Sequence, residues 1–441
     1  MSSIGSFVHV KVGKLVAADS LLRHGGFFRV WLAATVAVLG ESVSHLALPL
    51  TAAAVLHASP AQMGILFACG TLPFALFSLP AGVWMDRRSK RALIVGFNFL
   101  GGLALATVPL AFYLGRLDMP VLYAANFLVG SCFCVGGSAA QVFLTGLVGR
   151  DRLVEANSLQ ASATSIAGLA GPVMAGLLVA WLGAPIAVAV DAAAFALSAL
   201  LVASIHCVEA PLENTERAPV WSDLLAGLRF VWGHPMLRAF AMMAAMCIVL
   251  LDGFMALYVL HATRDLGLGA KEIAVVNMVG AAGALFGALI VHVLNRRIGK
   301  SDAIVVGFGA AGTGFLVYAL VPTGTWAVAV AGAAMFLVES GMTAYTVNYL
   351  AMRQEATPDA MLGRMTTTMR FLSVSGAPIG SAVIGQLAGR FGMVPILVTL
   401  GIAALLAALW SRRLLANQSA TGVPRSAALI SRTAQERWPI T

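Results

Sequence analysis

The sequence predicts an all-α integral membrane protein with twelve transmembrane helices arranged as two six-helix halves. Three observations predict it: 59% of the 441 residues are hydrophobic, only 11% are charged, and long apolar runs recur with short connectors between them. A soluble globular domain carries about 25% charged residues. Too few charges remain in this chain to cover a surface that faces water, so the composition favours a lipid environment.

Each predicted span is an apolar run that is long enough to cross the hydrocarbon core, which takes about 20 helical residues. The first run exceeds the roughly 7 to 15 apolar residues of a signal-peptide core, so we expect the chain to retain it. The predicted spans are 28–55, 62–84, 92–115, 120–148, 157–182, 185–205, 236–262, 273–294, 303–321, 325–350, 365–389 and 394–415.

The longest connector divides the spans into six plus six, a pattern typical of transporters that are built from two related halves. Within it, Trp221, Leu224, Leu225, Leu228 and Trp232 recur at helical spacing, which predicts an amphipathic helix along the cytoplasmic face. Its role is linker packing or, alternatively, partner binding. The predicted units are a cytoplasmic segment 1–26, a bundle 27–206, a linker 207–235, a second bundle 236–415 and a disordered cytoplasmic tail 416–441.

Basic residues predict the orientation in the membrane. Alternate connectors carry only Arg116, Arg264, Lys271 and Arg390, whereas the others hold most of the Lys and Arg. By the positive-inside rule both termini are cytoplasmic, in a multi-pass protein of the cell inner (plasma) membrane. The net charge is +9, but these cations are dispersed in short clusters and do not form one basic face, so no nucleic-acid partner is predicted.

Several chemical classes are excluded by context. The five cysteines form no C-x-x-C pair, so we predict neither a metal site nor a disulfide framework. The G-x-G-x-x-G match at Gly307 lies inside an apolar span, and Gly299-Lys300-Ser301 lacks the first glycine of a phosphate loop. Without a strand-turn-helix frame for catalytic residues, we expect no catalytic residue, no enzyme activity and no cofactor.

The loop between the second and third spans reads Gly82-Val-Trp-Met-Asp86-Arg87-Arg88-Ser89-Lys90-Arg91. It resembles the G-x-x-x-D-R-x-G-R-R signature of the major facilitator superfamily, although Ser89 replaces a glycine. A generic basic loop that only anchors the topology is the alternative. The resemblance implies the major facilitator fold and alternating access, and it places Asp86 against the eleventh span near Arg364, as part of a cytoplasmic gate.

Further stretches are similar to the drug, macrolide and siderophore efflux branch of that superfamily. They are Phe27–Trp31 with Gly40-Glu41, Arg152–Leu159, Gly227–Leu237 and Thr357–Arg364. In the fifth span Gly168, Gly171, Pro172 and Gly176 resemble a degenerate form of the motif associated with antiporters. Ordinary packing of small residues would produce the same pattern, and both interpretations stay open.

Ionisable residues deep in apolar spans are costly and are functional candidates by default. Glu41, Asp252 and Glu339 lie near the predicted midplane, Asp191 lies shallower, and His45 follows Glu41 by one turn. Each acid either carries protons or is hydrogen-bonded to a neighbouring helix in a structural role.

These observations predict proton-coupled efflux of a small hydrophobic or amphipathic compound, a drug or a siderophore, by a chain that functions as a monomer in the lipid bilayer. Uptake of a lipid-like or organic-acid solute is one alternative. A transport-inactive membrane receptor or scaffold is another.

Overall fold

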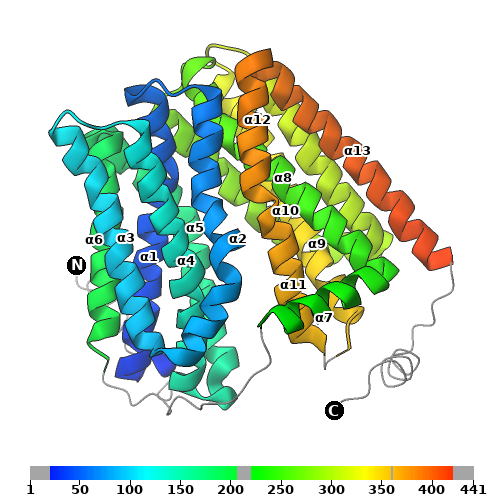
Figure 1. Ribbon diagram of the computed structural model, residues 1–441. Helices are drawn as coiled ribbons and strands as arrows, with labels where there is room; N and C mark the ends of the chain where they lie inside the picture. The colour runs from blue at the N-terminus through cyan, green and yellow to red at the C-terminus, as the bar shows by residue number, and fades with distance from the viewer. Residues whose placement is uncertain (1–19, 206–219, 359–360, 421–441) are drawn as a thin grey trace, which may run out of the picture.

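The computed structural model describes residues 20–205, 220–358 and 361–420. Every regular element in these ranges is a helix, so the all-α prediction is confirmed (Figure 1). The first half contains α1 (Gly25–Leu50), α2 (Pro60–Arg87), α3 (Lys90–Tyr113), α4 (Met119–Val148), α5 (Leu153–Leu182) and α6 (Ala184–Ala203). The π-helical turn Thr51–Val55 extends α1 without a break.

The second half contains α8 (Pro235–Arg264), α9 (Ala270–Ala319), α10 (Ala327–Glu355), α11 (Leu362–Ser375), α12 (Ala377–Phe391) and α13 (Met393–Ala420). The linker helix α7 (Val220–Gly233) appears where the amphipathic pattern predicts it, and it packs against α8 and α11. Most helices extend past the predicted apolar runs, and α13 runs to Ala420, into the segment assigned to the tail. Residues 421–441 lie outside the described ranges.

Ten helices of the described ranges are long and apolar enough to cross a membrane, or eleven if the bent helix α5 is counted as one span. One of the ten, α9, contains a non-helical residue, Gly299, with φ 82° and ψ 164°. A left-handed φ favours glycine because it has no Cβ. The chain can therefore change direction at this residue.

Contacts with α10 show that α9 does reverse direction. Before Gly299 the contacts advance along α10, and after it they return. In α9 order, the close pairs are Gly283 with Phe336, Gly287 with Ser340, Gly307 with Gly341, and Gly314 with Ala334. Two antiparallel segments within α9 raise eleven spans to twelve, the predicted number.

The predicted eleventh span, 365–389, is confirmed as one apolar span, Thr368–Phe391. Within it α11 ends at Ser375 and α12 begins at Ala377, but Gly376 between them keeps a helical backbone with φ −75° and ψ −25°. Pro378 lacks the N–H that would continue the hydrogen bonds of the preceding turn. The change at Gly376 therefore has a local cause in the sequence.

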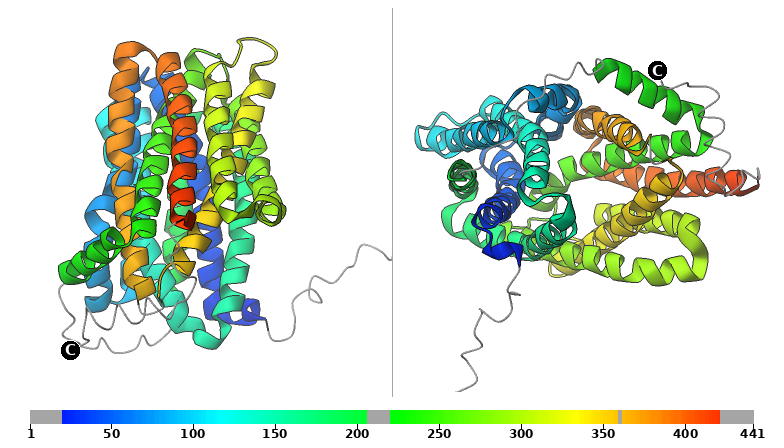
Figure 2. Two further views of the ribbon diagram at one scale, coloured as in Figure 1. Left: turned by 90° about the vertical axis from the view of Figure 1, so that its right-hand side faces the viewer. Right: turned by 90° about the horizontal axis from the view of Figure 1, so that it is seen from below.

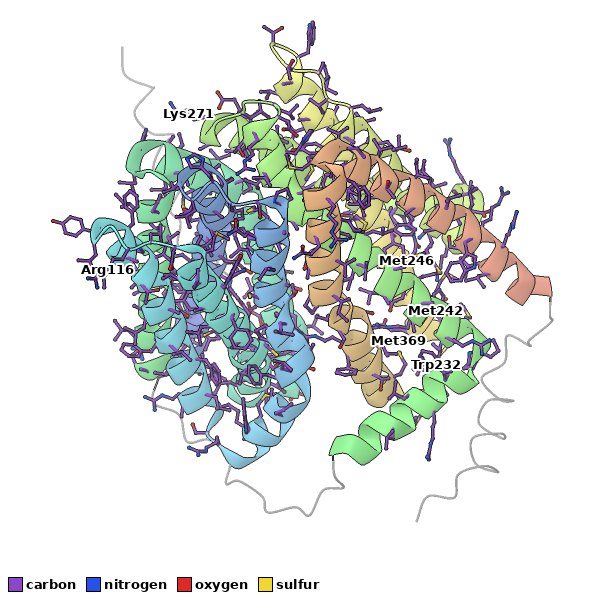
Figure 3. All side chains as sticks on the ribbon, turned by 45° about the horizontal axis from the view of Figure 1, so that its top comes forward. Arg116, Trp232, Met242, Met246, Lys271 and Met369 are labelled. Atoms are coloured by element: carbon purple, nitrogen blue, oxygen red, sulfur yellow. The ribbon has the colours of Figure 1, made fainter. Side chains whose placement is uncertain are left out.

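The two halves stand side by side, with α1–α6 in one and α8–α13 in the other (Figures 1 and 2). Figure 3 shows Arg116 and Lys271 toward one end of the bundle and Trp232 of α7 toward the other. Arg116 and Lys271 belong to connectors that the positive-inside rule places outside. The structure thus separates the two sets of connectors as the sequence predicts.

Candidate functional site

The two halves meet closely where α2 packs on α12. A Cβ on Gly64 would lie 2.9 Å from the Cα of Gly385, and a Cβ on Gly385 would lie 2.7 Å from both the Cα of Gly64 and the carbonyl oxygen of Pro60. Real side chains do not tolerate such distances. The absence of a side chain at both positions therefore allows the backbones to touch.

A second contact between the halves joins α5 to α9. A Cβ on Gly176 would overlap the Cβ of Ala274 and lie 3.5 Å from the carbonyl oxygen of Ala270. Gly176 lies near the end of α5, Ala274 near the start of α9, and Gly64 near the start of α2. Successive helices alternate in direction, so these helix ends lie at the end of the bundle that carries the Arg116 and Lys271 connectors. We call this the sealed end.

Glu41 and His45 of α1 form an ion-pair geometry, with 3.5 Å between Oε1 and Nε2. The protein leaves 31% of the Glu41 side chain and 74% of the His45 side chain exposed. The two groups follow each other by one helical turn, which brings side chains at i and i+4 together. The side chains of this pair therefore border free space and are not enclosed by direct packing.

Asp191 of α6 is fully buried, at 0% exposure. Neither of its carboxylate oxygens makes a hydrogen bond of normal length and angle. The Ser44 hydroxyl of α1 is the polar group that faces the carboxyl group. A Cβ on Gly40 would lie 2.5 Å from Asp191 Oδ1, so the carboxyl group fills the space above this glycine. Both roles considered for Asp191, proton carrier and structural acid, stay predictions.

The acids of the second half stand apart from this group. Asp252 lies on α8 and Glu339 on α10, both half-buried, and neither makes a hydrogen bond or an ion pair in the described chain. The Glu339 side chain packs against Gly280, its Cγ 3.4 Å from where a Cβ would be. The structure therefore brings together Glu41, His45 and Asp191, and it leaves Asp252 and Glu339 separate.

An aromatic and polar network in the second half was missed by the sequence interpretation. The Tyr318 hydroxyl donates to the Tyr258 carbonyl at 2.9 Å, and the Tyr258 hydroxyl donates to Asn277 Oδ1 at 2.7 Å. The rings of Phe254 and Phe315 stack with centroids 4.3 Å apart. The sequence does show Phe254 and Tyr258 four residues apart on one helix, a spacing that places both rings on one face. It does not show that Asn277 and Tyr318, which complete the hydrogen bonds, come from α9.

The loop motif is described only in part. The side chains of Asp86, Arg87 and Arg364 lie outside the described set, as do the surroundings of Gly82, so the gating role of these four residues stays a prediction. Ser89 caps α3 by accepting a hydrogen bond from the Ala92 amide at 3.1 Å. The serine that replaces the usual glycine thus provides a preferred N-cap residue.

Cations beside this loop cover the end of α6. Arg91 donates to the Ala203 carbonyl, and Arg29 donates to the Ser204 carbonyl at 2.8 Å. The last carbonyls of a helix lack partners within the helix and carry partial negative charge, so cations stabilise them. Lys90 opens α3 one residue earlier.

The glycines of the fifth span have different neighbours. A Cβ on Gly171 would lie 2.7 Å from the Ser42 Cβ of α1, Gly176 meets Ala274 across the halves, and a Cβ on Gly168 would touch nothing within 4 Å. The helix bends by 41° between Leu153–Gly168 and Ala170–Leu182, directly before Pro172. Close packing accounts for Gly171 and Gly176, whereas Gly168 and Pro172 lie at the bend.

Glu155 and Leu159 of the Arg152–Leu159 stretch bind the segment before α1 and α1 itself. Glu155 Oε1 accepts from the Leu21 amide at 2.8 Å, while Glu155 Oε2 accepts from Arg152 Nη2 at the same distance. Trp31 Nε1 donates to the Leu159 carbonyl at 3.1 Å. This stretch therefore fixes α1 to α5.

No group of three His, Cys, Asp or Glu residues that could hold a metal ion occurs among the described residues.

An all-helical bundle of two halves that meet through glycine contacts, with acids inside its spans, defines a multi-pass membrane protein of the transporter class. The chain belongs to the Major Facilitator Superfamily, whose model matches residues 30–381. The family resemblance of the loop motif is thereby confirmed.

Two curated relatives match most of the chain. The chain is 25% identical over 391 residues to the multidrug efflux pump Tap of Mycolicibacterium fortuitum, covering 87% of this chain and 94% of Tap. It is 25% identical over 378 residues to the enterobactin exporter EntS of Escherichia coli O1:K1 / APEC, covering 83% and 86%. The predicted likeness to the efflux branch is confirmed.

Solved structures agree on the fold. The nucleoside transporter NupG superposes with a TM-score of 0.74 at 9% identity, covering 88% of this chain and 99% of NupG. A bacterial homologue of the iron transporter ferroportin in its inward-facing state gives 0.67 at 17% identity, covering 90% and 99%. A bacterial homologue of ferroportin in an outward-facing state gives 0.56 at 16% identity, covering 90% of this chain and 99% of the homologue.

Proposed function

We propose that this transporter exports a small hydrophobic or amphipathic compound, a drug or a siderophore, and uses the proton gradient to do so. The observation that carries the proposal is the accessible Glu41–His45 pair inside a bundle that is sealed at one end. Similarity to an efflux pump and a siderophore exporter supports the direction of transport. Both halves and every candidate acid belong to one chain, which supports a monomer as the working unit.

The conformation supports alternating access. The sealed end carries the connectors that the positive-inside rule places outside, so the pathway in this state faces the cytoplasm. The greater likeness to the inward-facing than to the outward-facing ferroportin homologue agrees with that assignment. Rocking of the two halves about a central site would open the sealed end and close the other.

Glu41 and Asp252 supply the proton coupling in this proposal, because they come from the first spans of the two halves at corresponding depths. Export against a gradient needs energy, and an acid that is protonated on one side and ionised on the other couples the two movements. Asp86 and Arg364 form the cytoplasmic gate, where the positive N-terminal end of the eleventh span would hold the carboxylate. Both termini lie in the cytoplasm.

The test is transport by the purified chain in lipid vesicles with an imposed pH gradient. Ethidium, a lipophilic dye, and enterobactin are the two probes. We expect one of them to move uphill when protons flow in the opposite direction, and to stop when the gradient is collapsed. Movement with the protons would indicate uptake, and a chain that moves neither probe under any gradient would contradict the proposal and favour a receptor or scaffold.

A further inference from the structure

Asp191 is surrounded by apolar and small residues of α1 and α6. It has no exposed surface and no hydrogen bond at either oxygen. On α1 the backbone at Gly40 approaches so closely that a Cβ there would lie 2.5 Å from Asp191 Oδ1 and 2.6 Å from the Cβ of Ala194. This packing excludes a water molecule or a hydrated cation from that side of the carboxyl group.

An ionised carboxylate is unfavourable in this environment. Removing a charge from water without a partner costs several kcal/mol, and proteins avoid the cost by neutralising the group. A purely structural acid would be neutral as well, but it would donate its proton to an acceptor. Asp191 makes no such hydrogen bond of normal geometry here, and the Ser44 hydroxyl that faces it is also without one. A fully formed hydrogen bond to a partner is therefore missing in this conformation, and we assign it to another one.

The groups that can serve as that partner lie on α1. The charges of Glu41 and His45 act on Asp191, and Ser44 lies between them on the same helix. On α3, which also packs against α6, the neighbours are uncharged: Gly102 lies against the Ala192 carbonyl, and Asn98 donates to Ser198 Oγ at 3.0 Å. The only titratable side chains of the described residues whose fields reach Asp191 are thus the exposed acid–histidine pair.

We propose that Asp191 holds the transported proton in this cytoplasm-facing conformation and passes it to the Glu41–His45 pair when α1 shifts against α6. The O–H bond of the Asp191 carboxyl group breaks, an N–H bond forms on His45, and the imidazolium pairs with the Glu41 carboxylate. Exposed His45 then releases the proton to the cytoplasmic side. Asp191 becomes ionised only while it faces the pair. This inference rests on the proposed proton-coupled function and assigns its internal proton site.

The first test needs no substrate. Infrared spectra of the wild-type chain in lipid vesicles at neutral pH are compared with those of Asp191→Asn. We expect Asp191→Asn to lose one carboxylic acid band. The control is Ser198→Ala, which changes a buried residue of the same helix that does not titrate, and we expect it to keep the band. Loss of an ionised carboxylate band would overturn the proposal. If Asp191→Asn does not fold, Gly40→Ala is used instead, because the added Cβ displaces the intact Asp191 carboxyl group. A carboxylic acid band that does not shift in this variant would also overturn the proposal.

The second test separates this assignment from the proposed function. Two quantities are measured for the probe that the wild type exports, ethidium or enterobactin. One is uphill export under a pH gradient, and the other is exchange of the same probe without a gradient. We expect Asp191→Asn to lose at least tenfold in uphill export and to retain exchange. Undiminished uphill export by Asp191→Asn would overturn the assignment alone. Wild-type export that ignores the pH gradient would overturn proton coupling, and the assignment with it.

Discussion

Gly64 of α2 and Gly385 of α12 face each other across the two halves, and a Cβ on Gly64 would lie 2.9 Å from the Gly385 Cα. The backbones themselves form this part of the sealed end. Any movement that opens the pathway there must separate these two glycines. Their contact is thus the place where a small change of side-chain volume acts directly on the conformational equilibrium.

Gly64→Val should therefore slow transport. Overpacking costs about 1 to 3 kcal/mol, which corresponds to roughly a 5- to 150-fold change in the balance between two conformations. Export rate at a matched protein amount in vesicles measures it. Gly389→Ala on α12, the helix that faces Gly64, is the control, because a Cβ there meets the Ala61 Cβ at an ordinary 3.8 Å. Equal rates for Gly64→Val and the wild type would mean that the seal is not part of the cycle.

The orientation is testable by reporter fusions. We expect fusions after Arg116 and after Val321 to behave as external, and those after Lys90 and Lys300 as internal, because most Lys and Arg lie in the second set of connectors. An alkaline phosphatase reporter, active outside, and a fluorescent reporter, active inside, measure the two cases. The reversed pattern would invert the direction of transport that we propose.

Asp86→Asn should impair transport by at least tenfold while leaving the amount of folded protein unchanged. The amide keeps the shape of the side chain but removes the charge that the eleventh span is expected to hold near Arg364. Transport by the vesicle assay is compared with that of Arg88→Gln, a neighbouring change that removes charge outside the predicted gate. A fully active Asp86→Asn would reduce the loop to a topological anchor.

Glu41→Gln and Asp252→Asn test the two proposed carriers. Each amide preserves shape and removes titration, so uphill export should fail in both, while exchange down the substrate's own gradient should survive in at least one. Both modes are measured under an imposed pH gradient. If pH-driven export persists in both variants, these acids are structural and Glu339 is the next candidate.

His234, just before α8, provides a pH-dependent prediction for stability. Burial lowers the pKa of its imidazole, and its Nδ1 makes no hydrogen bond. The unfolded chain therefore binds a proton more readily, so folding stability should fall as the pH drops below about 6.5, the ordinary value for histidine. Thermal unfolding in detergent at pH 7 and pH 5 measures the loss. His234→Asn keeps an N-cap residue and should show a smaller loss, and an equal loss in both would disprove it.

Several features were predictable because they depend on nearby residues. The apolar runs predicted the helices, the linker pattern predicted α7, and the loop from Gly82 to Arg91 predicted the family. The turn at Gly376 inside the eleventh span was not predicted, although Pro378 follows it in the sequence. Hydropathy averaged over a window measures the length of a span, and Thr368–Phe391 is one span of 24 residues.

The sequence by itself determined which segments enter the membrane, since the free energy of transferring a helix into lipid depends on that helix alone. It also identified the acids that are costly in a span. Only the tertiary structure decided that Asp191 is a fully buried acid, and that it lies where the charges of Glu41 and His45 act on it. That arrangement depends on how closely α1 and α6 approach at Gly40. Close packing between segments far apart in the chain is a property of their shapes together, and no single segment encodes it.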